Sequence, residues 1–102
     1  MTEIVDRLPP MHPGEMLREE FLLPLSLSSG KVAKAAGIPR TRIERIVREE
    51  TGITADTALR LARYFSTTPE FWVNLQSGYD LDVATRASTE QIKRDVHPRA
   101  AA

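Results

Sequence analysis

The sequence has no cysteine, no long apolar run and no net charge, and the first two absences exclude several kinds of site and location. Without cysteine there are no disulfides and no thiolate metal ligands, so the fold must depend on apolar packing in a reducing compartment. No stretch approaches the roughly 20 apolar residues that span a bilayer. The first ten residues also lack the apolar segment of a secretory signal. We therefore expect a soluble cytoplasmic protein without a membrane partner.

The residue patterns of known enzyme sites are missing as well. His12 and His97 are far apart in sequence, and neither has a cysteine or a carboxylate motif beside it that would indicate metal binding or acid–base catalysis. There is no Gly-rich phosphate loop and no nucleophile motif. We predict that the protein is not an enzyme and has no catalytic residue, no cofactor and no metal site.

What the sequence does contain is a series of helix signals spread over one domain's length of 102 residues. Each apolar stripe of helical spacing follows a cap residue or a proline, and strand-like alternation does not occur. The first helix is expected to stop near Leu23, because Pro24 disfavours a helical conformation in the residue before it. We predict an all-α fold, a compact five-helix bundle, with helices near residues 13–23, 29–36, 39–50, 55–65 and 69–83.

The ends of the chain are expected to differ from this bundle. Residues 1–11 are predicted to form a flexible N-terminal segment, residues 12–86 the domain, and residues 87–102 a polar C-terminal tail. Within the tail, Thr89 can cap at most one marginal turn, a possible short sixth helix.

Residues 28–48 have the pattern of a helix-turn-helix. Ala33 is small enough for close contact between two helices, Gly37 can end the first helix, and Ile43 with Ile46 gives the second helix a buried face. The segment holds six basic residues and one acid, a net charge of +5, so the rest of the chain carries −5. An arginine-rich helix alone is more often a solvated surface, but this combination favours DNA binding.

The exposed face of the second helix carries the candidate base contacts. Arg40 and Arg45 are expected to contact guanine, which accepts two hydrogen bonds from arginine in the major groove. Thr41 is expected to contact a thymine methyl group or a phosphate, and Glu44 either a cytosine amino group or a neighbouring arginine that it holds in place. Phosphate contacts are expected from the remaining polar residues of the segment: Ser28, Ser29, Lys31, Arg42 and Arg48.

The fifth predicted helix has an aromatic stripe that allows two interpretations. Trp72, Leu75 and Tyr79 are either core residues, the commoner case at helical spacing, or a homodimer interface. A pairing element is needed because two recognition helices must lie about 34 Å apart to read successive major-groove faces.

Three blocks of sequence resemble the HigA family of antitoxins, within the Cro and phage-repressor class whose fold is of the lambda-repressor type. They are HPGEMLREEF at 12–21, ITADTALRLA at 53–62 and TPEFWVNLQ at 68–76, and the resemblance spans about residues 11–86. Two features depart from it: Ser29 stands where many members of the class have glutamine, and Gly78 lies inside a helix, where it could mark a bend or close packing against a partner chain.

The resemblance implies a cytoplasmic homodimer that binds operator DNA, represses its own operon and neutralises a HigB-like toxin, a ribonuclease that cleaves mRNA on translating ribosomes. The acidic first helix, the first ten residues and the polar tail are each candidate docking segments for that toxin. Two other functions stay open, a stand-alone transcriptional regulator without a toxin and a protein-interaction module whose basic helix is incidental.

Overall fold

The computed structural model describes residues 10–100, so most of the predicted flexible segment 1–11 lies outside the described residues, as do residues 101–102. Within the described part all regular structure is helical, which confirms the predicted all-α, five-helix fold. The first helix is continuous through a central π-helical stretch. The helices are α2 (Pro13–Met16), η1 (Leu17–Leu22) and α3 (Leu23–Leu25), which together form the first, then α4 (Ser29–Ala36), α5 (Arg40–Val47), α6 (Ala55–Phe65) and α7 (Pro69–Asp95).

Side-chain caps define where four of these helices begin. Ser28 caps α4, Thr54 caps α6 and Thr68 caps α7, each through a hydroxyl oxygen that accepts from a backbone N–H three residues on. His12 caps α2 with a ring nitrogen instead of a hydroxyl, because its Nδ1 accepts from the N–H of Gly14 at 2.8 Å. These bonds satisfy N–H groups that have no partner inside the helix.

The predicted end of the first helix at Leu23 was wrong, because the helix continues through Pro24 to Leu25. A π-helical stretch precedes the proline, and the N–H of Leu23 donates to the carbonyl of Arg18, five residues back. Proline is excluded from an ordinary helix because its ring meets the carbonyl four residues before it, and the wider turn relieves that contact. The same widening brings Leu22, five residues after Leu17, onto the buried face with Leu17.

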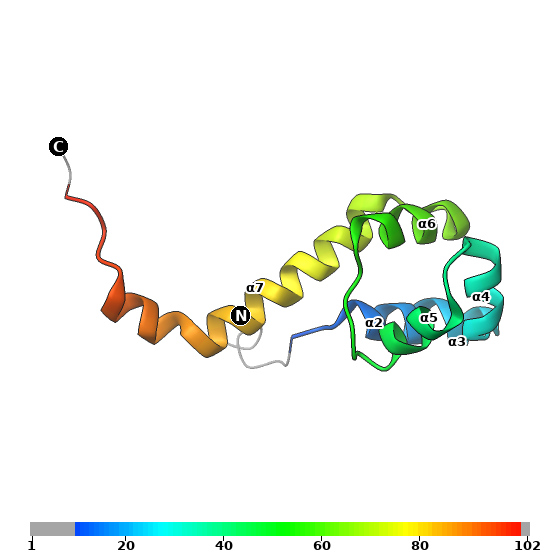
Figure 1. Ribbon diagram of the computed structural model, residues 1–102, viewed down its shortest axis with the longest axis horizontal. Coiled ribbons are helices and arrows are strands. Elements are labelled where there is room, and N and C mark those ends of the chain that lie inside the picture. Colours follow the sequence, from blue (N-terminus) through cyan, green and yellow to red (C-terminus); the bar gives the residue numbers. More distant parts are fainter. Residues whose placement is uncertain (1–9, 101–102) are drawn as a thin grey trace.

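The core lies between two groups of helices. In Figure 1, α6 and the start of α7 lie on one side, α2 and α5 on the other, and α4 closes one end. Trp72 is completely buried at the centre and packs against the rings of Phe21 and Phe71. Burial of such apolar side chains supplies most of the stability of a cysteine-free domain.

The C-terminal part of α7 projects from this core and gives the chain a long dimension of 54 Å (Figure 1). The prediction of a tail with one helical turn from Thr89 was wrong, since α7 continues without a break to Asp95. Extending a helix that already exists costs much less than nucleating a new one. Side-chain pairs one turn apart, such as Arg86 with Asp82 at 2.8 Å, also support the extension.

Candidate nucleic-acid interface

α4 and α5 form the predicted helix-turn-helix, joined by a three-residue turn. Gly37 ends α4 in the left-handed conformation with φ of 68°, which glycine adopts without the steric cost other residues meet. Ile38 then folds back, donates its N–H to the carbonyl of Ala33 at 2.9 Å and is buried. Ala33 is also buried, and α4 packs against α5, as its small side chain predicts.

α5 has one buried face and one exposed basic face. Ile43 and Ile46 are completely buried, whereas Arg40, Arg42 and Arg45 are exposed. α5 ends at Val47, three residues before the predicted end, because the chain turns at residues 48–50. The remaining predicted contact residues also lie at the surface: Ser28, Lys31, Thr41 and Arg48 are exposed, and Ser29 and Glu44 are half-buried.

Two arrangements bring these residues together. The guanidinium group of Arg40 lies across the start of α4, 3.8 Å from where a Cβ on Gly30 would stand. Thr41, Arg42 and Arg45 line a shallow hollow beside α5, together with Thr51. Sequence reasoning missed Thr51, because the path of the loop after α5 cannot be read from local patterns.

Glu44 holds one arginine of this face. Its Oε2 accepts from Nε of Arg40 at 3.1 Å, one helical turn away. With Nε engaged, the two terminal nitrogens of Arg40 are left for an outside acceptor, in the fork geometry that matches guanine or phosphate. Within residues 10–100, Arg42, Arg45 and Arg48 have no carboxylate in ion-pair distance. Their charge is therefore available to an anionic partner.

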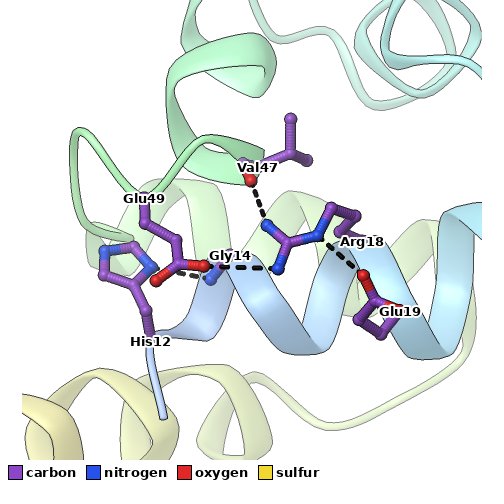
Figure 2. Close-up of polar contacts among 6 residues, drawn as sticks. All are labelled: His12, Gly14, Arg18, Glu19, Val47 and Glu49. Carbon is purple, nitrogen blue, oxygen red and sulfur yellow. Dashed lines mark hydrogen bonds and ion pairs between the residues drawn. The ribbon is translucent and has the colours of Figure 1, made fainter. Parts of the chain in front are cut away.

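A second polar cluster, which sequence reasoning also missed, lies at the other end of α5 (Figure 2). Arg18 donates to the carbonyl of Val47 at 2.5 Å and pairs with Glu49 at 3.3 Å and Glu19 at 2.8 Å. The hydrogen bond to Glu19, together with that to Glu49, raises the pKa of Arg18 above its ordinary value. No sequence signal links Arg18 to residues 29 and more positions away.

His12 lies at the edge of this cluster. Its ring contacts the ring of Tyr79 on α7 edge-on, with centroids 4.8 Å apart. Burial lowers the pKa of His12 below its ordinary value, although Glu49 and Asp80 oppose the shift. A neutral imidazole is what the cap requires, because Nδ1 accepts the Gly14 N–H only when it carries no proton.

Comparison with known proteins identifies a family with this fold. A helix-turn-helix family model matches residues 17–72. Virulence-associated protein I of Dichelobacter nodosus is 49% identical over 92 residues, which cover 90% of this chain and 81% of that protein. The structure of the Pseudomonas aeruginosa antitoxin HigA with the higBA promoter is 45% identical, with a TM-score of 0.86 over 89% of this chain and 99% of that one. The chain belongs to the HigA family of antitoxins.

A further structure, the antitoxin GraA in complex with its operator, is similar to this HigA-family chain at 41% identity and a TM-score of 0.87, covering 92% of this chain and 95% of that one. The family model includes both helices of the helix-turn-helix and Arg18. The resemblance drawn from the three sequence blocks is thereby confirmed.

In this HigA-family chain, the three residues considered for a dimer interface separate into two groups. Trp72 has no exposed surface, and its indole N–H donates to Oγ1 of Thr67 at 2.8 Å, so it is a core residue. Leu75 packs partly against the core, and Tyr79 is half-buried against His12. Both retain exposed surface, and their contact with a second chain stays a prediction.

Two further properties bear on other classes of function. Across residues 10–100, histidine, aspartate and glutamate side chains do not gather into a group that could hold a metal ion. None of the helices in that range combines the length and the apolar character needed to cross a membrane.

Proposed function

We propose that this chain is the antitoxin of a toxin–antitoxin module, which binds operator DNA as a dimer, represses its own operon and neutralises a HigB-like mRNA-cleaving toxin. The observation that carries the proposal is the exposed basic face of α5, opposite the buried Ile43 and Ile46, on the fold of antitoxins solved with promoter or operator DNA. An arginine-bearing helix of this kind fits the major groove.

The contacts divide into two kinds. Arg40 and Arg45 are assigned to base edges, since both are exposed on α5 and each can bind guanine through two parallel hydrogen bonds. Thr41 lies between them in sequence and is assigned to the same surface. The other polar residues of the segment are assigned to phosphates: Ser28, Ser29, Lys31, Arg42 and Arg48.

Dimerisation is assigned to the projecting part of α7. Leu81 and Ile92 are exposed there by 69% and 53%, with Val83 exposed by 40%, although apolar side chains favour burial. Leu81 and Ile92 lie about three helical turns apart on one face of α7, so pairing of two α7 helices along that face would cover both and set the spacing of two recognition helices. Leu75, Tyr79 and Val83 recur every four residues along another face of α7, starting nearer the core, and are assigned to contacts with the second chain there.

The chain is proposed to act by binding alone, without a catalytic step, and in the cytoplasm where operator DNA is found. The neutralised toxin would be a separate basic protein encoded beside this gene. A growth experiment tests that part: expression of the neighbouring gene should arrest growth, and co-expression of this chain should restore it. If DNA binding is found but no such toxin exists, the chain is a stand-alone regulator.

DNA binding is tested by fluorescence anisotropy with a duplex from the region upstream of the gene. The logarithm of the binding constant should fall linearly with the logarithm of salt concentration, because each neutralised phosphate releases counterions. Arg45→Ala should cost about 1–3 kcal/mol on the preferred duplex. Arg63→Ala on α6 removes the same charge away from α5 and serves as the control. A flat salt dependence would refute the assignment of phosphate contacts.

A further inference from the structure

The end of the recognition helix α5 depends on one side chain from another helix. Of its last four carbonyl groups, three accept from backbone N–H groups of the turn at residues 48–50. The fourth, on Val47, accepts from the guanidinium group of Arg18 (Figure 2). Carbonyls at a helix end need partners outside the helix, so Arg18 completes the hydrogen bonding of α5.

The turn itself contains a residue in an unfavourable conformation. Glu49 has φ of 63°, in the left-handed region that this type of helix ending normally reserves for glycine. Its carboxylate pairs with Nη2 of Arg18 at 3.3 Å. Arg18 therefore holds both the last carbonyl of α5 and the strained residue that reverses the chain after it.

Arg18 is in turn fixed relative to α5 by a close backbone contact. Gly14, one turn before Arg18, packs so tightly on α5 that a Cβ would stand 1.8 Å from the carbonyl oxygen of Ile46. The N-terminus of α5 has no side-chain cap, since its cap residue is Pro39. The C-terminal turn of α5 is thus held both by a close backbone contact and by the side chain of Arg18.

We infer that Arg18 is a positioning residue for DNA recognition: it sets the orientation of α5 through Val47 and Glu49 without touching DNA. The inference rests on the proposed operator binding. Base contacts demand placement of a side chain within about half an ångström, whereas phosphate contacts tolerate more freedom. Loss of Arg18 should therefore weaken binding to the preferred sequence more than binding to DNA in general.

The test compares two duplexes, one selected by the parent chain from a randomised library and one shuffled to the same composition. For Arg18→Gln in the full chain, the ratio of the two affinities should fall about tenfold, the cost of one imperfect base contact. Affinity for the shuffled duplex and the salt dependence should match those of Arg63→Gln, which loses the same charge from exposed α6 surface.

Two further variants separate positioning from loss of stability. Glu49→Gly places the residue that prefers the left-handed conformation at this turn, so the double variant R18Q/E49G should recover most of the lost ratio. Arg18→Lys keeps one donor for Val47 and should fall between parent and R18Q. All variants are compared at a temperature where circular dichroism shows each to be folded.

The results distinguish the two levels of the argument. An R18Q ratio within twofold of the parent, or no recovery in R18Q/E49G, would overturn the positioning role of Arg18 while leaving DNA binding intact. Absence of any salt-dependent binding by the parent chain would instead refute the proposed function.

Discussion

Gly14 and Gly30 permit a sharp test of the contact between α2 and α5. Each is the second residue of its helix, α2 and α4 respectively, so alanine makes the same local change at both. A Cβ on Gly30 would meet the side chain of Arg40 at 3.8 Å, an ordinary contact. A Cβ on Gly14 would stand 1.8 Å from the carbonyl oxygen of Ile46 and 2.8 Å from its carbon.

The magnitude follows from those distances. Gly14→Ala forces two helix backbones apart by more than an ångström, and over-packing of this kind typically costs about 1–3 kcal/mol. Because backbone atoms cannot rotate away, we expect the upper part of that range. Alanine also lowers the conformational entropy of the unfolded chain, which stabilises the helix by about 0.5–1 kcal/mol. The net decrease in the free energy of unfolding is then about 2 kcal/mol. The midpoint temperature should fall by about 10 °C.

The assay is urea unfolding of both variants at one protein concentration, followed by circular dichroism and by the fluorescence of Trp72, the only tryptophan. Gly30→Ala should match the parent or exceed its free energy of unfolding by up to about 0.5 kcal/mol, with an unchanged urea dependence. Equal free energies of unfolding for the two variants would refute the close contact between Gly14 and Ile46.

Three other outcomes follow from single contacts. His12 has a lowered pKa, so its contribution to stability is complete above pH 6.5 and is lost as the pH falls below that value. His12→Asn keeps a cap that does not titrate, so the free energy of urea unfolding should depend less on pH between pH 7 and pH 5. A pH dependence equal to that of the parent would contradict this. Glu44→Gln removes an exposed ion pair and should change the free energy of unfolding by less than about 0.5 kcal/mol. It should reduce discrimination between bases at the same base pair as Arg40→Ala does. Reduced discrimination at a different base pair would mean that Glu44 itself contacts DNA. A Cβ at position 78 would meet nothing within 4 Å, so Gly78→Ala should stabilise α7 by about 0.5–1 kcal/mol. Weaker dimerisation of this variant, measured by sedimentation, would show that a second chain packs there.

Local sequence determined where most helices begin and which face each one buries. Ser28, Thr54 and Thr68 cap helices because a side-chain oxygen reaches an N–H only three residues on, and such short-range bonds are visible in the sequence. Gly37 specified the turn of the helix-turn-helix through its own backbone freedom. The spacing of Ile43 and Ile46 likewise fixed the buried face of α5 and hence its basic face.

Tertiary structure decided what depends on residues far apart in the chain. Whether Trp72 is core or interface depends on Phe21, 51 positions earlier, and on the other rings packed around it. The passage of the first helix through Pro24 depends on a π-helical stretch that no propensity scale encodes. Likewise, the extension of α7 to Asp95 follows from a helix already nucleated against the core.

The two ends of the candidate site illustrate the difference. The exposure of Arg40 and Arg45 was predictable because helical periodicity alone places them away from the buried face of α5. Arg18 was not, because its contacts with Val47 and Glu49 exist only once α2 packs on α5. The sequence thus determined which side chains face outward on the recognition helix, and the tertiary structure decided how that helix is held, since its support comes from a helix that only folding brings beside it.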